Sequence, residues 1–289
     1  MKRGEPTKRK AFGVIQYAPG RTLPLGSQLS LNYLHFMPAI TDGPVPLKNW
    51  DIFRGVLLAL HFAADGHQRI TGSAVMVGPG IALAASHVVE LEAPRMAAGA
   101  ITGVMTAITP TGLMIWHPGQ ITCQDESDVA IVTATCVSDL PTGNVMSVAS
   151  MSSRIPRIGE RIMICGFRAG HQEFAHTPSG DEIGGDVYVS TGRVTQVFPE
   201  RRDAFLVPWP AIEVDCYTLG SMSGGPAFNE EGRLIGVLAT SLDSYDRCGP
   251  SYVSLIGPAM SVGFRPVWPI RALNDICFRG SGRAVCELE

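Results

Sequence analysis

The sequence predicts an all-β protein of short antiparallel strands, arranged as a sandwich or a barrel. Glycine and proline are both abundant, with 32 and 21 residues in a chain of 289, which favours many turns over long helices. Apolar residues make up 45% of the chain and charged residues 17%, so the sequence can fill a substantial core. The length suits one large all-β domain or two smaller units.

The first half of the chain contains apolar runs at the spacing of antiparallel strands. Turn residues at 65–67 and 78–80 separate these runs, as they do in connected hairpins. We expect a helical turn to begin at residues 86–89, directly after the third run. The predicted strands lie at residues 56–62, 70–77, 81–85 and 129–132, with two further β segments between residues 101 and 115.

The second half repeats this pattern after residues 140–157, which we interpret as a linker because the apolar pattern lapses there. Strands are predicted at residues 158–167, 187–197, 211–215, 234–239 and 252–257, a loop at 169–186 and a terminal helix at 270–278. The predicted organisation is an irregular N-terminal extension at residues 1–51, two β units at 52–145 and 146–260, and a C-terminal tail or helix at 261–289.

Composition and charge restrict the class of protein. The net charge of -3 gives no electrostatic reason to propose a nucleic-acid partner. No apolar stretch approaches the roughly 20 residues that span a bilayer, and the basic residues 1–10 are not followed by a secretory apolar segment. The seven cysteines are scattered without a C-x-x-C pair. We therefore expect a cytoplasmic protein with reduced thiols and no membrane partner.

The segment that organises the chemistry is the glycine-rich run GSMSGGP at residues 220–226. It lies between two apolar runs, so it forms a tight loop between strands. Glycines let such a loop expose a hydroxyl and direct its backbone amides at one point. Ser223 is therefore the candidate nucleophile, and a nucleophilic serine needs a base and a group that orients the base.

Two segments of the first half supply these partners. His87 follows the apolar run at residues 81–85, where a side chain can leave the sheet and face a cleft. Asp128 lies immediately before the apolar run at 129–132, which places a carboxylate at the end of a core strand. Asp125 on the same polar stretch is the alternative orienting acid.

The segments around His87, Asp128 and Ser223 resemble those of trypsin-like serine peptidases, in the same order along the chain. The resemblance covers about residues 53–260 and is closest to the bacterial, disulfide-free type. It implies a chymotrypsin-like fold of two six-stranded antiparallel β-barrels, with histidine and aspartate in the first and serine in the second. An α/β-hydrolase is disfavoured because that fold orders the triad as serine, acid, histidine and needs a G-x-S-x-G elbow.

The resemblance implies a serine endopeptidase that hydrolyses peptide bonds through an acyl-enzyme, with His87, Asp128 and Ser223 as catalytic residues. It implies protein or peptide substrates, leaves room for a regulatory protein partner, and requires neither a metal nor an organic cofactor. The implied oxyanion hole comprises Ser221, Met222 and Ser223. The implied substrate pocket comprises Asp215, Tyr217, Thr218, Ala239, Thr240 and Ser241.

Two departures from the family pattern leave a second interpretation open. Ser221 stands where the family usually has glycine, and Met222 stands where the digestive branch has an aspartate. If position 221 needs an unusual backbone conformation, serine can misdirect the oxyanion amide. The alternative is therefore a catalytically inactive protease-fold module that binds or scaffolds partners.

Overall fold

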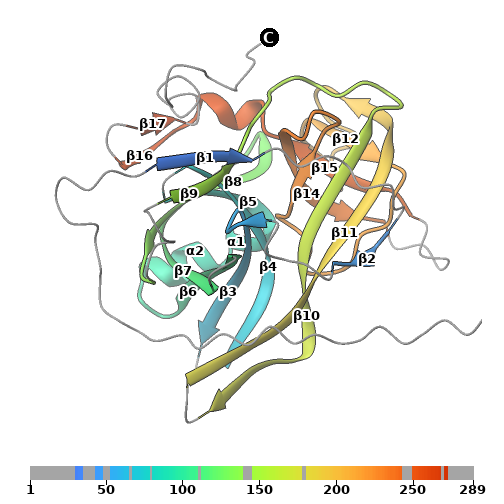
Figure 1. The fold of residues 1–289 in the computed structure, drawn as a ribbon. Coiled ribbons are helices and arrows are strands. Elements are labelled where there is room, and N and C mark those ends of the chain that lie inside the picture. Colours follow the sequence, from blue (N-terminus) through green and yellow to red (C-terminus); the bar gives the residue numbers. More distant parts are fainter. Residues whose placement is uncertain are drawn as a thin grey trace, which may run out of the picture.

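Two closed antiparallel β-barrels lie side by side in the computed structural model, as Figure 1 shows. The structure describes residues 30–34, 43–47, 53–64, 67–78, 80–109, 112–138, 145–177, 180–242, 249–267 and 270–272. The predicted all-β double barrel is confirmed. The domain boundaries given above stay predictions.

The first barrel closes in the order β3-β4-β5-β8-β7-β6. Two short helices, α1 (Ser86–Val89) and α2 (Glu92–Ala97), follow β5. The strands are β3 (Leu57–Ala64), β4 (His67–Gly78), β5 (Ile81–Ala85), β6 (Thr102–Thr109), β7 (Gly112–Gln124) and β8 (Ser127–Cys136). The helical turn predicted at residues 86–89 is confirmed as α1.

The second barrel has the order β10-β13-β14-β15-β12-β11, and β11 pairs back to β10. Its strands are β10 (Arg161–Thr177), β11 (Gly180–Phe198), β12 (Ala211–Val214), β13 (Pro226–Phe228), β14 (Leu234–Ser241) and β15 (Ser251–Leu255). The serine loop therefore connects β12 to β13, which places it at one end of this barrel.

Shorter elements border the two barrels. In the N-terminal extension, β1 (Ser30–Leu34) pairs in parallel with β9 (Val145–Ala149), and β2 (Val45–Pro46) pairs with β11. After β15, the chain forms the 3-10 helix η3 (Pro258–Ser261) and the pair β16 (Gly263–Val267) and β17 (Ile270–Ala272). The extension thus adds one strand to the segment between the barrels and one to the second barrel.

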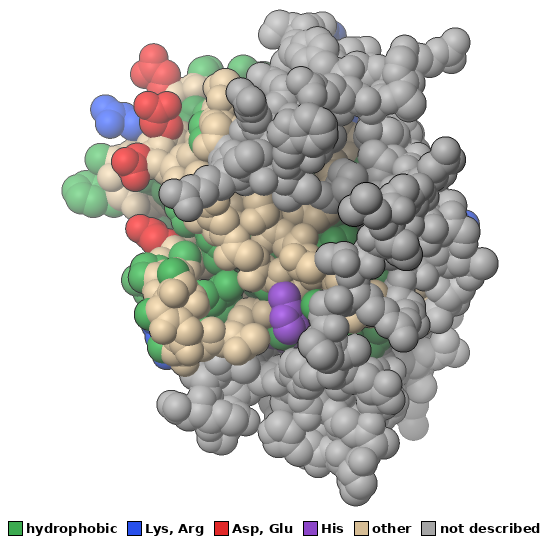
Figure 2. Space-filling view, turned by 90° about the vertical axis from the view of Figure 1, so that its left-hand side faces the viewer, with side chains coloured by type: hydrophobic (Ala, Val, Ile, Leu, Met, Phe, Trp, Pro, Cys, Tyr) green, Lys and Arg blue, Asp and Glu red, His purple; other side chains and the backbone are tan. Residues whose placement is uncertain are grey.

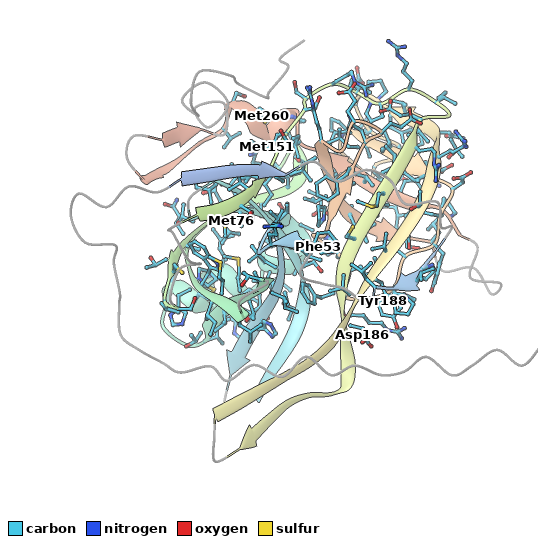
Figure 3. All side chains as sticks on the ribbon, viewed as in Figure 1. Phe53, Met76, Met151, Asp186, Tyr188 and Met260 are labelled. Carbon is cyan, nitrogen blue, oxygen red and sulfur yellow. The ribbon has the colours of Figure 1, made fainter. Side chains whose placement is uncertain are left out.

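Successive residues of the first-barrel strands face two different cores, which explains their continuous apolar runs. Leu58 and Leu60 of β3 pack inside the first barrel, whereas Leu57 packs against the second barrel. Figure 3 shows Met76 within the first barrel and Phe53 at the junction. A strand that is buried on both faces loses the alternation of polar and apolar residues.

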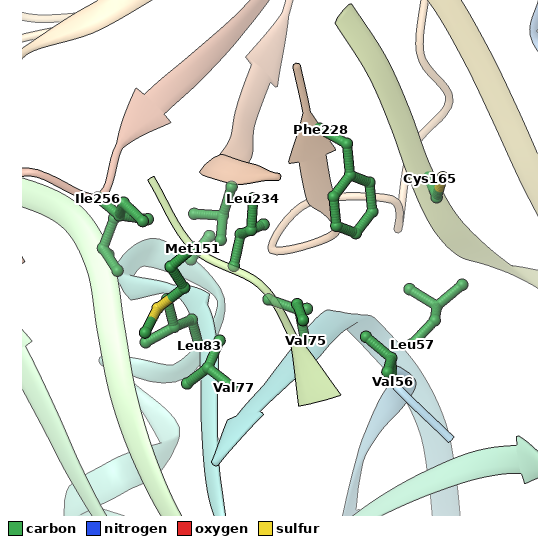
Figure 4. Packing of buried hydrophobic residues seen from close by; sticks show 14 of the residues in the cluster. Val56, Leu57, Val75, Val77, Leu83, Met151, Cys165, Phe228, Leu234 and Ile256 are labelled. Carbon is green, nitrogen blue, oxygen red and sulfur yellow. The ribbon is translucent and has the colours of Figure 1, made fainter. Parts of the chain in front are cut away.

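The junction between the barrels is a continuous apolar core. Figure 4 shows Val75 and Val77 of β4 near Phe228 and Leu234 of the second barrel. Met151, from the segment between the barrels, belongs to the same buried cluster. This packing fixes the two barrels relative to each other, and so fixes any site whose residues come from both.

Three predictions about secondary structure were wrong. Residues 169–186, predicted as a loop, belong to a long hairpin in which β10 and β11 pair as far as Thr177 and Gly180. This hairpin extends beyond its barrel in Figure 1. Its strands are defined by their backbone pairing, and the sequence there lacks the alternation of apolar residues that predicts a strand. The linker at 140–157 contains β9, and residues 270–272 form β17 where a helix was expected. The rest of that helix prediction lies outside the described residues.

Three general properties of the described residues are their surface charge, the state of their cysteines and the length of their helices. On the face drawn in Figure 2, the described acidic side chains lie along one edge, and most of the remaining described surface is uncharged. Cys123, Cys136, Cys165 and Cys216 are free thiols, as the sequence predicted. Among the helices in the described ranges, none has the length and hydropathy of a transmembrane helix.

An ion pair ties the segment after β9 to the start of the second barrel. Arg154 donates to both carboxylate oxygens of Glu160, at 2.9 and 2.6 Å, and the Arg157 backbone amide donates to the same carboxylate at 3.0 Å. The Glu160 side chain is only 8% exposed. Burial raises the pKa of Glu160, but the Arg154 guanidinium and the backbone amide outweigh it and hold the pKa below the ordinary 4.5.

Replacing Arg154 by alanine is expected to lower the free energy of unfolding by about 1–2 kcal/mol at pH 7. Because the folded-state pKa of Glu160 is depressed, its contribution is present above pH 4.5 and is lost as the pH falls through the folded-state value. Denaturant unfolding at several pH values measures this. The exposed Arg95–Glu92 pair is the control, and Arg95→Ala should cost about 0.5 kcal/mol or less. An Arg154→Ala deficit that is equally large at pH 3 and pH 7 would contradict the assignment.

Candidate active site

His87 and Asp128 form a hydrogen-bonded pair at the edge of the first barrel. His87 Nδ1 lies 2.8 Å from Asp128 Oδ2, and the His87 backbone amide donates to Asp128 Oδ1 at 3.0 Å. The aspartate side chain is 2% exposed and the histidine side chain 46% exposed. Since a carboxylate only accepts hydrogen bonds, this geometry puts the proton on Nδ1 and leaves Nε2 as an acceptor facing outward.

Local structure explains why these two residues meet. β5 and β8 are neighbours in register, with Ala85 opposite Val129, so α1 begins beside the start of β8. Asp128 is therefore next to His87 across the ladder. Asp125, the alternative acid, is exposed in the turn between β7 and β8. Asp128 is the carboxylate that the fold brings to the histidine.

A serine of the second barrel, which sequence reasoning missed, supports Asp128. Ser254 on β15 is fully buried, and its hydroxyl accepts a hydrogen bond of 3.2 Å from the Asp128 backbone amide. The Ser127 hydroxyl lies 3.5 Å from the same oxygen and accepts the Val129 amide at 3.1 Å. Ser254 and Asp128 are 126 residues apart, so no local pattern in the sequence marks this contact.

The serine loop is packed so tightly that a side chain is excluded at Gly224 and at Gly225. Gly224 has a φ of +81°, and a Cβ there would overlap the Ser73 carbonyl oxygen and approach the Ala85 amide to 2.9 Å. A Cβ at Gly225 would overlap the Cys165 carbonyl oxygen. The loop of the second barrel thus lies directly on β4 and on the end of β5, the strand that leads to His87.

Ser223 lies beside the histidine segment. Its carbonyl oxygen accepts the Ser73 amide at 2.8 Å, and a Cβ at Gly72 would be 2.8 Å from both that oxygen and Val88 Cγ1. In the described residues, the Ser223 hydroxyl donates to the Ala239 carbonyl at 3.4 Å and forms no hydrogen bond with the His87 ring.

Ser221 has a left-handed backbone conformation, which is unusual for a residue other than glycine. Its φ is +70°, a region in which side chains other than glycine are strained. The next residue stabilises this loop from inside. Met222 is fully buried, its amide donates to the Leu219 carbonyl at 3.2 Å, and its thioether accepts the Leu219 amide at 3.3 Å. The Met222 amide is therefore used within the loop.

Replacing Ser221 by glycine is expected to raise the free energy of unfolding by about 0.5–1 kcal/mol. Relief of left-handed strain is worth about 1–2 kcal/mol, and the greater freedom of glycine in the unfolded chain offsets part of it. Thermal or denaturant unfolding measures the difference. As a control, Ser153→Gly changes a serine without a positive φ and should destabilise or be neutral. A destabilised Ser221→Gly variant would contradict the strain argument.

The residues predicted to line a substrate pocket have definite partners. The Asp215 carboxylate accepts the Arg193 backbone amide and lies against Gly192, so it is engaged with β11. The Tyr217 carbonyl accepts the Ser190 hydroxyl at 2.7 Å, and the buried Thr218 hydroxyl lies 2.9 Å from Ser251 Oγ. Ala239, Thr240 and Ser241 form the end of β14 beside Ser223. The assignment of a pocket to these six residues stays a prediction.

Two titratable side chains of the first barrel, Cys123 and His61, are neutral at pH 7. Burial raises the pKa of the Cys123 thiol, which lies near Ser86 and Asp128. Burial lowers the pKa of His61 to about 3, so this fully buried imidazole carries no charge at neutral pH. Within the described part of the chain, no three His, Cys, Asp or Glu side chains gather where they could hold a metal ion.

Comparisons with solved structures give distant similarities, at identities below 20% and TM-scores below 0.5. The MamO protease domain of Magnetospirillum magneticum matches at 13% identity over 70% of this chain and 93% of that one, with a TM-score of 0.43. Deg5 matches at 15% identity over 68% and 83%, with a TM-score of 0.48. The HtrA-type protease AlgW, solved with a tripeptide, matches at 18% identity over 72% and 59%, with a TM-score of 0.47.

Comparison of the sequence with protein-family models identifies the family of the chain. A search of curated proteins gave no match. The family model for a trypsin-like peptidase domain matches residues 72–237, which is more than half of the chain and includes His87, Asp128 and Ser223. On this match, and with the double barrel that the structure displays, the chain belongs to the trypsin-like peptidase domain family.

Proposed function

We propose that this protein is a serine endopeptidase in which Ser223 is the nucleophile, His87 the general base and Asp128 the group that orients the base. The observation that carries the proposal is the His87–Asp128 pair, held by two hydrogen bonds beside the loop that presents Ser223. The carboxylate is buried and the imidazole half exposed, so the outward nitrogen can meet a hydroxyl and a substrate.

The proposed reaction begins when Ser223 Oγ attacks the carbonyl carbon of a peptide bond. The new C–O bond forms as the carbonyl π electrons move to oxygen, and His87 Nε2 takes the hydroxyl proton. Collapse of this intermediate breaks the C–N bond, and His87 returns the proton to the leaving amine. Water then repeats the sequence on the acyl-enzyme. Asp128 holds Nδ1 protonated and stabilises the imidazolium.

Two backbone amides of the serine loop are available as oxyanion donors. Met222, Gly224 and Gly225 donate to carbonyls of Leu219, Leu238 and Met222. Within the described residues, the amides of Ser221 and Ser223 donate to no protein acceptor. The amides of Ser221 and Ser223 are therefore available to donate to the oxyanion of a bound substrate. Each such donor stabilises the transition state by roughly 3 kcal/mol.

The end of β14 provides a place for the substrate backbone. Thr240 and Ser241 pair on one edge with Tyr252 and Ser251 of β15. On their other edge, no described strand pairs with residues 239–241. An extended peptide can add there as a further strand, which places its scissile bond over Ser223 beside Ala239.

Hydrolysis of a peptide library tests the proposal. Wild-type protein is expected to cleave internal peptide bonds, and Ser223→Ala is expected to cleave none above background. The Asp125→Asn variant is the control, because Asp125 lies in an exposed turn. A wild type that binds peptides with the same affinity as Ser223→Ala and cleaves none would favour a binding module.

That second function has a specific observation in its favour. Ser221 holds a strained backbone, and the Ser223 hydroxyl is bonded to Ala239 and not to His87. A protein that binds peptides on β14 without cleaving them would tolerate both features. The library experiment distinguishes the two functions, because only the peptidase loses an activity when Ser223 is replaced.

A further inference from the structure

Ser73 of the first barrel makes three hydrogen bonds at the point where the two barrels meet the serine loop. Its backbone amide donates to the Ser223 carbonyl at 2.8 Å, and its hydroxyl lies 3.4 Å from the Ser221 carbonyl, to which it donates. The same hydroxyl accepts the Phe167 amide of β10 at 2.8 Å. Ser73 itself is fully buried, so its own amide and hydroxyl are shielded from solvent.

The strand that carries Ser73 also positions the base. β4 pairs with β5 through Ala74 opposite Ala84, and β5 leads directly into α1 and His87. Gly224 lies against the Ser73 carbonyl and the Ala85 amide, so the serine loop touches both strands at once. Ser73 therefore lies in the direct line of contacts from the histidine segment to the serine loop.

The conformation of Ser221 indicates what the hydrogen bond from the Ser73 hydroxyl contributes. Ser221 has a φ of +70°, which an L-residue keeps only where its surroundings hold it. A carbonyl fixed on one side of Ser221 restricts its backbone angles, and so fixes the direction of the amide on the other side. That amide is one of the two proposed oxyanion donors.

We infer that Ser73 is a positioning residue for the oxyanion hole, which holds Ser221 in its left-handed conformation through the Ser221 carbonyl. This inference rests on the proposed peptidase function. Ser73 does not contact the substrate. Glycine would adopt the left-handed conformation at position 221 without support, whereas Ser221 needs the hydrogen bond from the Ser73 hydroxyl to hold it. The same residue connects position 221 to β4 and β5, the strand pair that leads to His87.

The rate of labelling by a fluorophosphonate probe tests the inference, since the phosphoryl oxygen of the probe occupies the oxyanion position. Ser73→Ala is expected to lower the maximal labelling rate about 3- to 5-fold, because a hydrogen bond as long as 3.4 Å contributes in the lower part of the usual range. The half-saturating probe concentration should not change, because the oxyanion charge develops only in the transition state.

A double-mutant cycle with Ser221→Gly separates positioning from general damage. Glycine adopts a positive φ without support, so the loss caused by Ser73→Ala should shrink to about 2-fold or less in the Ser221→Gly background. A merely structural role for Ser73 gives the same fold-loss in both backgrounds. Thr109→Val removes another buried hydroxyl, in the β6–β7 hairpin outside the site, and should not change the labelling rate.

The outcomes are distinguishable. If wild-type protein fails to label, the proposed function fails and takes this inference with it. If wild type labels, and folded Ser73→Ala labels at the wild-type rate or shows equal losses in both backgrounds, the inference alone is overturned. Should Ser73→Ala not fold, Ser73→Cys carries the test: a weaker donor predicts a smaller, Ser221-dependent loss, and an unchanged rate overturns the inference.

Discussion

Replacing Asp128 by asparagine is expected to lower kcat by about 10⁴-fold while the fold stays intact. Asp128 accepts two hydrogen bonds from His87, one from the backbone amide and one from Nδ1. Asparagine offers one acceptor oxygen and a donating amide group. If the oxygen keeps the backbone amide, the NH₂ group faces Nδ1 and stabilises the tautomer whose Nε2 carries the proton. That ring cannot accept the proton of Ser223.

Peptide hydrolysis under substrate saturation measures this effect, with thermal unfolding to check the fold. Asp125→Asn is the matched control, since it makes the same chemical change three residues away in an exposed turn. We expect the control to retain wild-type kcat. An Asp128→Asn variant that keeps more than a tenth of the activity would show that the carboxylate does not orient the base.

Removing the nucleophile or the base is expected to have the largest effect of all. Ser223→Ala and His87→Ala should each lower kcat by about 10⁵- to 10⁶-fold, because neither residue acts without the other. For the same reason the double variant should be no worse than either single variant. The hydroxyl and the imidazole come from different barrels, so this non-additivity tests whether they work as one unit.

Kinetics of all three variants with one peptide substrate measure the effect. The prediction fails if the losses multiply, giving a double variant far below both single variants. It also fails if His87→Ala retains substantial activity while Ser223→Ala has none, since another group would then be the base. Unfolding curves of the three variants should remain close to wild type, because His87 is half exposed and Ser223 lies on a loop.

The strands were predictable where both faces are buried. The run at residues 81–85 is apolar throughout because β5 faces the barrel interior on one side and the junction on the other. Its boundaries in the structure, Ile81–Ala85, are the predicted ones. The hairpin at 169–186 was missed because its pairing is satisfied by backbone hydrogen bonds, which leave no apolar pattern in the sequence.

The site was predictable only in part, for a related reason. His87, Asp128 and Ser223 lie in segments with recognisable local chemistry, so they could be chosen without a structure. Ser73 and Ser254 act through contacts 148 and 126 residues away in the sequence, and serines in apolar strands carry no mark of such contacts. The strain at Ser221 was foreseeable, because the family usually has glycine at this position. The Ser73 hydroxyl that contacts the Ser221 carbonyl was not foreseeable from the sequence.

The most direct test of the central claim is to find which residue a fluorophosphonate modifies. Wild-type protein is incubated with the probe and digested, and the adduct is located by mass spectrometry. A single adduct on Ser223, absent from both Ser223→Ala and His87→Ala, is the predicted result. An unmodified Ser223 in folded wild-type protein, or an adduct that persists when His87 is removed, would contradict a nucleophile activated across the two barrels.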